Sequence, residues 1–216
     1  MTQLPSSVLR NALAQTPLVA ILRGIAPIEA PHIGQALWDA GFRILEVPLN
    51  SPQPFESIAA LRKALPDALI GAGTVLSVDQ VQQLKAVGGQ LVIAPNFNPA
   101  VLSAAKQAGM LAIPGVATPT EAFAALAAGA DAIKLFPAEM ISPAALKAMR
   151  AVLPRDALLL PVGGIGAANM AAYWTAGANG FGIGSSLYSP GKAISDIQCD
   201  AIELIANCAV FMPPKG

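Results

Sequence analysis

A lysine and a glutamate each stand alone inside apolar stretches of this sequence, where charged side chains are rarely found. Lys134 lies in "DAIKLFP" and Glu46 lies in "ILEVPLN". Burial favours the uncharged forms, so it lowers the pKa of a lysine and raises the pKa of a carboxyl group. A neutral amine can attack a carbonyl to form a Schiff base, and a carboxyl with a raised pKa can exchange protons. The two residues therefore predict carbonyl chemistry, with Lys134 as nucleophile and Glu46 as general acid and base.

Both residues also have structural interpretations. The amine of Lys134 could reach the rim of the fold or pair with an acid, and Glu46 could form an ion pair with Lys134 or Arg23. Arg23 ends the apolar run in "AILRGI". Its guanidinium could hold a carboxylate or a phosphate in a fork, or it could pair with Glu46. An isolated acid and an isolated amine in similar surroundings favour catalysis over ion pairing.

Two glycine-rich stretches, "PVGGIG" and "GFGIGSS", end late apolar runs. Their residues Gly163, Gly164, Gly184 and Ser185 could bind phosphate through backbone N–H groups, although such glycines also form ordinary tight turns. Thr74, in "GAGTV", could donate its hydroxyl to an anionic substrate group or be merely a residue at a strand end. None of these stretches forms G-x-G-x-x-G after a first strand, so a dinucleotide-binding fold is poorly supported.

A repeated pattern must position these residues. Alanine-rich amphipathic segments end at Gly41, Gly88, Gly109, Gly129 and Gly177, and an apolar run follows each of them. Glycine after a helix adopts the left-handed conformation that ends it, so each repeat predicts a helix followed by a buried strand. Ser77 and Thr118 are expected to cap two of the helices. The chain contains eight apolar runs: "PLVAILRG", "FRILEVPL", "ALIGAGTV", "QLVIAP", "MLAIPG", "DAIKLFP", "LLLPVGG" and "GFGIGSS".

Strands that alternate with helices favour parallel pairing, and eight units predict a closed (β/α)8 TIM barrel, with a doubly wound open sheet as the alternative. We expect one domain over residues 1–216, with an extra N-terminal helix at 1–15 and a loose tail at 212–216. In such barrels the active site lies where the strands end. The candidate residues follow different strands, so we expect them to converge there.

Composition excludes several classes of function. The chain has 54% apolar and 12% charged residues, with 13 basic against 13 acidic, so no basic stripe for nucleic acid is expected. The charge-free stretch 157–191 is interrupted by Pro161 and several glycines, which argues against a membrane span. His32 is the only histidine, so a metal site has little support. Cys199 and Cys208 are expected to pack inside a helix, and with no signal-peptide pattern we expect a cytoplasmic protein.

Taken together, several segments in chain order resemble the class I aldolases that cleave 2-dehydro-3-deoxy-6-phospho sugar acids. The segments are "AILRG", "LEVPLNSP", "IGAGTVL", "AIKLFPAE", "PVGGI" and "GIGSSLY". The resemblance implies that Lys134 is the Schiff-base lysine and Glu46 the acid and base. It places Arg23, Thr74, Gly164, Gly184 and Ser185, together with Gly163, at substrate-binding positions. It also implies a homotrimer, pyruvate as one product, a sugar acid phosphate as substrate, and no metal or organic cofactor.

Within that family the sequence is more similar to members that act on the galactonate substrate. Enzymes for the gluconate epimer usually read E-V-T-L-R-T and P-T-G-G-I at two of these places. Here Asn50 stands at the arginine position and Val162 at the threonine position. These changes are expected to alter contacts to the C4 hydroxyl and the carboxylate, so both residues are candidate specificity determinants. The gluconate epimer, a phosphate-binding barrel isomerase or epimerase, and a non-catalytic sugar phosphate binding protein are the alternatives.

Overall fold

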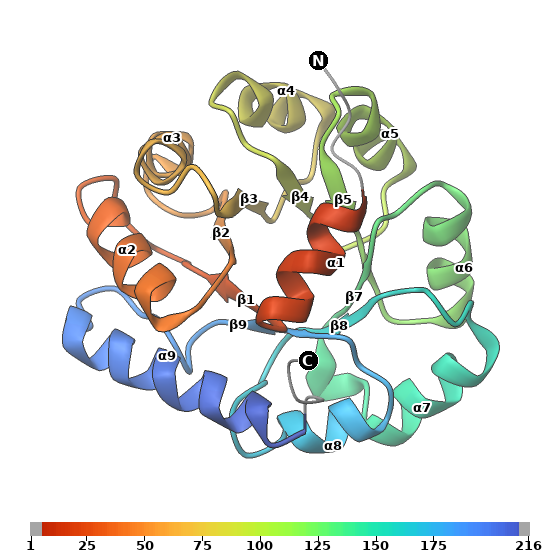
Figure 1. Cartoon of the computed structure of the whole chain (residues 1–216). Helices are drawn as coiled ribbons and strands as arrows, with labels where there is room; N and C mark the ends of the chain where they lie inside the picture. The colour runs from red at the N-terminus through yellow and green to blue at the C-terminus, as the bar shows by residue number, and fades with distance from the viewer. Residues whose placement is uncertain (1–5, 212–216) are drawn as a thin grey trace.

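The computed structural model describes residues 6–211 and places a ring of helices around a set of short strands (Figure 1). The strands are β1 (Leu18–Ile21), β2 (Ile44–Pro48), β3 (Leu69–Gly73), β4 (Leu91–Ile93), β5 (Leu111–Ile113), β6 (Gly115–Val116), β7 (Ile133–Leu135), β8 (Leu159–Pro161) and β9 (Phe181–Ile183). The helices are α1 (Ser6–Gln15), α2 (Ala30–Ala40), α3 (Pro54–Ala64), α4 (Val78–Ala86), α5 (Pro99–Gln107), α6 (Pro119–Ala127), the short 3-10 helix η1 (Ala138–Met140), α7 (Pro143–Val152), α8 (Met170–Thr175) and α9 (Ile194–Ala209).

All the paired strands run parallel, as the alternating pattern predicts. They form a six-stranded sheet in the order β5-β4-β3-β2-β1-β9 and a three-stranded sheet in the order β6-β7-β8. Each predicted apolar run contains a strand, but the fifth run forms both β5 and β6, separated by Pro114. Proline has no N–H to donate to a ladder, which explains the break. The parallel α/β fold is therefore confirmed, while the strand pairing gives two sheets instead of one eight-stranded ring.

Backbone hydrogen bonds link the two sheets on both sides of the interior. Between β5 and β7, the N–H of Asp131 donates to Ala112 O at 2.9 Å, and the N–H of Lys134 donates to Pro114 O at 2.9 Å. On the other side, Val162 forms an isolated parallel bridge with Gly182 of β9. The strand ends that carry the candidate residues are thereby held in one framework.

Local sequence signals set the helix ends as expected. The hydroxyls of Ser77 and Thr118 accept hydrogen bonds from the N–H groups of Gln80 and Glu121, and both form reciprocal capping boxes. The glycines that mark the repeat have positive φ angles, which confirms the predicted helix stops: Gly41, Gly88, Gly109, Gly129 and Gly177.

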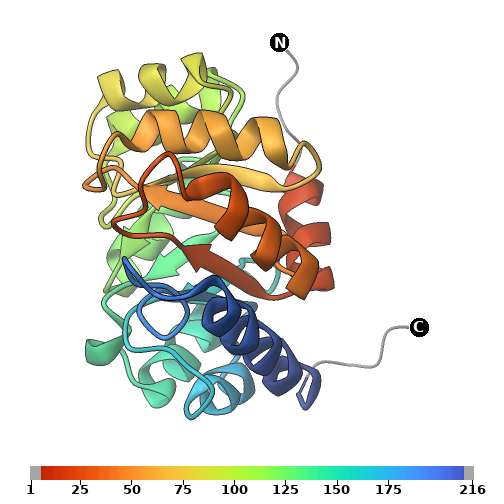
Figure 2. The same cartoon turned by 90° about the vertical axis from the view of Figure 1, so that its left-hand side faces the viewer.

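Helix α1 covers the end of the molecule where the strands begin (Figure 2). Its residues Leu9, Ala12 and Leu13 pack in one buried cluster with strand residues such as Val19 and Leu160. The predicted N-terminal helix is therefore confirmed over Ser6–Gln15. The remainder of its predicted range, residues 1–5, and the predicted tail at 212–216 lie outside the described residues.

Alternation along the strands decides which side chains enter the interior. In β2, Ile44 belongs to the interior cluster, whereas Leu45 belongs to the cluster between strands and helices. Side chains two residues apart share a face, so Glu46 is directed inward like Ile44. In β7, Ile133 and Leu135 both belong to the outer cluster, which leaves Lys134 facing the interior. The buried acid and amine thus lie on the same inner surface.

The two cysteines differ in environment. Cys208 is buried in α9, as expected for a packing residue, but Cys199 is exposed, so the packing prediction was wrong for that residue. Cys199 lies outside the buried face of α9, which is formed by residues such as Ile197, Ala201 and Leu204. Both thiols are free. Across residues 6–211, no helix is long and apolar enough to cross a membrane.

Candidate active site

Strands β2 and β7 bring Glu46 and Lys134 to a narrow cavity inside the strands, which we call the inner cavity. Its volume is about 10 Å³, close to the space of one water molecule. Glu46 is 2% exposed and Lys134 is 6% exposed, so both charged groups are largely withdrawn from solvent. The cavity is lined by Val19, Ile21, Glu46, Ile93, Ile113, Lys134, Leu160, Val162 and Gly182.

Lys134 has the surroundings of an uncharged amine. Burial lowers the pKa of Lys134; the Glu46 carboxylate opposes this shift, and the Arg23 guanidinium adds to it. The apolar partners differ from those expected from the sequence, because Ile133 and Leu135 face the helices. Instead, side chains of other strands supply the apolar wall of the cavity. The ring of Phe136 lies beside the amine, with Nζ 4.6 Å from the ring centroid.

Glu46 has the surroundings of a proton-exchanging carboxyl group. Burial raises the pKa of Glu46 to about 7, although Lys134, Arg23 and the backbone N–H of Gly73 each act to lower it. Its Oε2 atom is buried and has no hydrogen-bond partner among the described residues. A buried carboxyl oxygen without a partner is costly to retain in a fold, which favours a role in chemistry over one in stability.

The ion pair considered as a structural role for these residues is not formed. Among residues 6–211, no charged atoms of Lys134 and Glu46 approach within 4.0 Å, and Arg23 makes no ion pair with Glu46 either. Arg23 instead donates from Nη1 to Asn50 Oδ1 at 2.6 Å. The neighbouring N–H of Gly24 donates to Ser51 Oγ at 2.9 Å, so two hydrogen bonds join the ends of β1 and β2. The guanidinium is therefore held at the end of β2, where Asn50 lies.

A larger pocket of about 600 Å³, which we call the outer pocket, adjoins the inner cavity where the strands end. The two share Ile21, Val162 and Gly182 in their linings. A substrate held at Lys134 could therefore extend past Val162 into the outer pocket. The outer pocket is lined by Ile21, Arg23, Phe136, Glu139, Val162, Gly163, Gly164, Ile165, Gly166, Ala167, Ala168, Asn169, Gly182, Gly184, Ser185 and Ser186.

The loops after β8 and β9 form much of the lining of the outer pocket. Gly163 and Gly164 have φ angles of 111° and 60°, a conformation that glycine adopts at little cost. Asn169 fixes this loop, because its Oδ1 accepts from the N–H of Gly166 and its Nδ2 donates to Gly164 O. Within the described part of the chain, the N–H groups of Gly164, Ile165, Gly184 and Ser185 have no acceptor. Free N–H groups around a pocket are suited to binding an anion.

Most residues predicted from the sequence meet at these two spaces. Lys134, Glu46 and Val162 line the inner cavity. Arg23, Val162 and the four predicted glycine and serine residues line the outer pocket: Gly163, Gly164, Gly184 and Ser185. Asn50 contacts Arg23 from outside both linings. Thr74 lines neither space, and its φ angle of 58° places it in the left-handed region that few threonines occupy.

Sequence reasoning missed two residues. Glu139 lines the outer pocket, and it lies only three residues beyond Phe136 in a segment that already carried Lys134. Extending the search for polar residues past the strand end would have found it. Gly73 lies against the Glu46 carboxyl, but this contact depends on the register in which β2 pairs with β3, which no sequence signal specified. Across residues 6–211, His, Cys, Asp and Glu side chains form no group of three or more that could hold a metal ion.

The sequence of this chain is similar to those of known aldolases. The sequence matches the family "Aldolase: KDPG and KHG aldolase" over residues 9–205. A probable 2-dehydro-3-deoxy-6-phosphogalactonate aldolase from Rhizobium meliloti (strain 1021) is 49% identical over 193 residues, covering 89% of this chain and 91% of that protein. A 2-dehydro-3-deoxy-6-phosphogalactonate aldolase from Escherichia coli (strain K12) is 50% identical over 180 residues, covering 82% and 87%.

The fold matches as well. A solved structure described as "Native KDPGal structure" superposes with a TM-score of 0.89 at 45% identity, and the match covers 91% of this chain and 96% of that one.

Proposed function

Because the chain belongs to the KDPG and KHG aldolase family, we propose that it cleaves 2-dehydro-3-deoxy-6-phosphogalactonate to pyruvate and D-glyceraldehyde 3-phosphate through a Schiff base. The two relatives at 49% and 50% identity are named for this substrate, which supports the choice within the family. The observation that carries the proposal is the pairing inside one cavity of a buried amine with a lowered pKa and a carboxyl group with a pKa of about 7.

The reaction begins at Lys134. Its uncharged amine attacks the C2 ketone and forms a carbinolamine, which loses water to give a protonated imine. Glu46 supplies the proton that the departing hydroxyl needs, because its carboxyl group is about half protonated near neutral pH. The apolar lining of the inner cavity lowers the pKa of the amine and so favours its uncharged form before the attack.

The protonated imine then accepts the electron pair of the C3–C4 bond. As this bond breaks, the C4 hydroxyl loses its proton to the Glu46 carboxylate and becomes the aldehyde of glyceraldehyde 3-phosphate. Lys134 keeps the remaining three carbons as an enamine. Glu46 returns the proton to C3, and water hydrolyses the resulting imine to release pyruvate and the free amine.

The outer pocket would hold the phosphate end of the substrate. Gly164, Gly184 and Ser185 line this pocket, and their backbone N–H groups have no acceptor among residues 6–211. Arg23 is the cation of the lining and would bind either the phosphate or the C1 carboxylate. Binding energy from a phosphate remote from the reacting bond positions the substrate for cleavage.

Trapping with borohydride tests the imine step. Borohydride added with pyruvate should reduce the imine to a stable amine, so the intact mass should increase by one reduced pyruvate and peptide mapping should place it on Lys134. A protein whose mass stays unchanged would contradict Schiff-base chemistry and favour proton abstraction by Glu46, as in an isomerase. Pyruvate release from both C4 epimers, measured with a coupled lactate dehydrogenase assay, identifies the preferred substrate.

We further propose three features of the whole protein. The hydrogen bonds between the two sheets support one closed (β/α)8 barrel over a single domain. The family resemblance supports a homotrimer, which light scattering would test. Two free thiols, one of them exposed, accord with a reducing cytoplasm.

A further inference from the structure

The aromatic ring of Phe136 lies against the nitrogen that reacts, and the reaction above gives this ring no role. Lys134 Nζ lies over the face of the ring, 4.6 Å from its centroid. Phe136 follows β7, two residues beyond Lys134, so the two side chains are directed to the same side of the strand. Phe136 is half-buried and lines the outer pocket, whereas Lys134 lines the inner cavity. The ring and the amine therefore meet where the two spaces adjoin.

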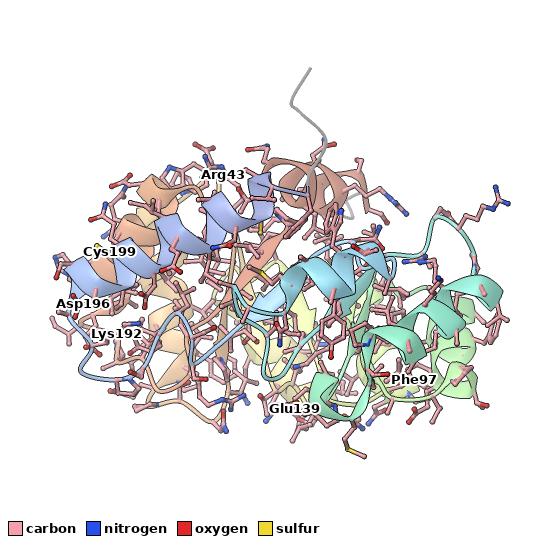
Figure 3. All side chains as sticks on the ribbon, turned by 90° about the horizontal axis from the view of Figure 1, so that it is seen from below. Arg43, Phe97, Glu139, Lys192, Asp196 and Cys199 are labelled. Atoms are coloured by element: carbon pink, nitrogen blue, oxygen red, sulfur yellow. The ribbon has the colours of Figure 1, made fainter. Side chains whose placement is uncertain are left out.

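Backbone hydrogen bonds hold the segment that carries the ring. The N–H of Phe136 donates to Val116 O at 3.0 Å, and the N–H two residues further on donates to Val162 O at 2.9 Å. The segment continues into η1, where Glu139 lies at the end of the molecule opposite Arg43 (Figure 3). The backbone on either side of the ring is thus bonded to segments on both sides of β7, which limits how far the ring can move from Nζ.

The ring acts differently on the charged and the neutral forms of the nitrogen. The face of an aromatic ring attracts a positive charge, and this attraction is stronger where water is excluded. Lys134 is only 6% exposed, so its nitrogen is in such a place. The Glu46 carboxylate also favours a positive charge on Nζ, and the Arg23 guanidinium opposes it. Because the ring does not titrate, its attraction stays constant while Glu46 gives and takes protons.

The charge on Nζ changes twice during the proposed reaction. When the carbinolamine loses its hydroxyl, the C–O bond breaks, Glu46 supplies the proton of the departing water, and the nitrogen lone pair forms the C=N bond, which leaves the nitrogen positive. When the C3–C4 bond breaks, its electron pair forms the C2=C3 bond and the C=N pair returns to nitrogen, which becomes neutral. A ring that faces Nζ therefore stabilises the imine relative to both the carbinolamine and the enamine.

We propose that Phe136 is a catalytic residue whose ring face stabilises the positive charge of the protonated imine on Lys134. The contribution expected from one ring at a nitrogen withdrawn from water is about 10-fold in the equilibrium between carbinolamine and imine. This inference rests on the proposed aldolase function, since it concerns the imine formed in that reaction.

The experiment replaces Phe136 alone with phenylalanines that carry one, two or three fluorine atoms. Fluorine withdraws electrons from the ring face and changes the shape of the side chain little. The same replacements at Phe123 are the matched control, because Phe123 is exposed on α6 and lines neither space. Phe136→Leu removes the aromatic face and keeps an apolar side chain. Imine formation is measured by equilibration with pyruvate over a range of concentrations and pH, quenching with excess borohydride, and intact mass.

We expect the pyruvate concentration that half-saturates trapping to rise with each fluorine on Phe136. At alkaline pH, where the amine starts uncharged, the rise should reach about 3–10-fold with three fluorines and about 10-fold in Phe136→Leu. The rise should shrink as pH falls, because the ring also stabilises the ammonium form of Lys134, and the charge on nitrogen is then the same before and after imine formation. Fluorination of Phe123 should change nothing.

Two outcomes would overturn the inference. One is a half-saturating concentration that stays constant across the fluorinated series at Phe136. The other is a rise of the same size at every pH, which would mean that fluorine alters the fit of pyruvate and not the charge on Nζ. Trapping of pyruvate by the wild-type protein supports the proposed function in both cases, whereas a wild-type protein that traps no pyruvate would contradict the proposed function itself.

Discussion

The carboxyl group of Glu46 occupies the space that a side chain on Gly73 would need. A β-carbon on Gly73 would lie 2.5 Å from Glu46 Oε1 and closer still to Oε2. The two residues come from neighbouring strands, since β2 pairs with β3 and Pro48 lies opposite Gly73. The glycine at the end of β3 thus provides the room in which the acid of β2 is buried.

The first prediction follows from this contact. Gly73→Ala should displace the Glu46 carboxyl group, because the new methyl group overlaps it. We expect kcat to fall at least 10-fold and the free energy of unfolding to fall by about 1–3 kcal/mol, as for other overpacked sites. Urea unfolding and the pyruvate assay measure the two effects. If the overlap is the cause, adding Gly73→Ala to Glu46→Ala should cost far less stability than adding it to the wild-type chain.

The second prediction concerns Glu46 as a proton carrier. In the free protein its pKa is about 7, and the loss of water from the carbinolamine requires the protonated form, which gives its proton to the departing hydroxyl. The value of kcat/KM for cleavage should therefore fall as pH rises through an inflection near pH 7. Glu46→Gln should lose this inflection and lower kcat by about 10²–10⁴-fold. An unchanged pH profile in the variant would assign the proton transfer to another group.

The third prediction concerns stability at the same residue. A carboxyl whose folded pKa is about 7, against the usual 4.5, stabilises the fold fully below pH 4.5 and loses this contribution as pH rises through 7. The loss is on the order of 3 kcal/mol, at about 1.4 kcal/mol for each pKa unit. The free energy of unfolding of Glu46→Gln, relative to wild type, should therefore increase between pH 5 and pH 8. Urea unfolding at several pH values measures the difference, and parallel curves would contradict the raised pKa.

The fourth prediction tests whether turnover needs the free amine of Lys134 or only a long basic side chain at this position. Lys134→Arg keeps a long basic side chain in the inner cavity but offers no free amine, since arginine stays protonated. We expect turnover to fall by roughly 10⁴-fold or more, as when other nucleophiles are removed. Borohydride with pyruvate should leave its mass unchanged. Circular dichroism provides the folding control, and substantial turnover by the arginine variant would rule out an imine at this position.

The fifth prediction concerns the choice between the C4 epimers. Val162 lies where the inner cavity meets the outer pocket, so its side chain borders the part of a substrate just beyond Lys134. Val162→Thr replaces one methyl group of the side chain with a hydroxyl group of nearly the same size. The kcat/KM ratio of the galactonate to the gluconate substrate should fall by about 5–10-fold, the effect of one hydrogen bond. Val152→Thr, at an exposed site of α7, is the matched control. An unchanged ratio would move the specificity contact to another residue, with Asn50 as the next candidate.

Much of the site could be predicted because strand order, strand direction and residue type suffice to place it. Parallel strands all end at one side, so residues such as Lys134 and Gly164 had to converge there once the repeat was recognised. The surroundings of Lys134 were harder to predict from the sequence. Strand alternation directs Ile133 and Leu135 toward the helices, so the apolar neighbours of Lys134 come from other strands. Sequence neighbours were therefore a poor guide to what buries the amine.

Contacts that depend on strand register or on loop path could not be read from the sequence. The overlap between Gly73 and Glu46 requires the pairing of β2 with β3, and the hydrogen bond from Arg23 to Asn50 requires two loops to meet. The hydrogen bond from Arg23 also shows what Asn50 contacts. Asn50 accepts a hydrogen bond from Arg23, which reaches it from the end of β1. Pro114 could be seen in the fifth apolar run, but the sequence did not show that it places β5 and β6 in different sheets.

The position of α1 has a consequence for the order of events in turnover. Its apolar side chains fill the interior beneath the strands, so the reaction chamber is a blind-ended tube whose mouth lies among the loops after the strands. On the proposed mechanism, the three carbons tethered to Lys134 would lie farther from the mouth than the aldehyde fragment. The aldehyde must therefore depart before pyruvate is freed, which imposes a fixed sequence on product exit.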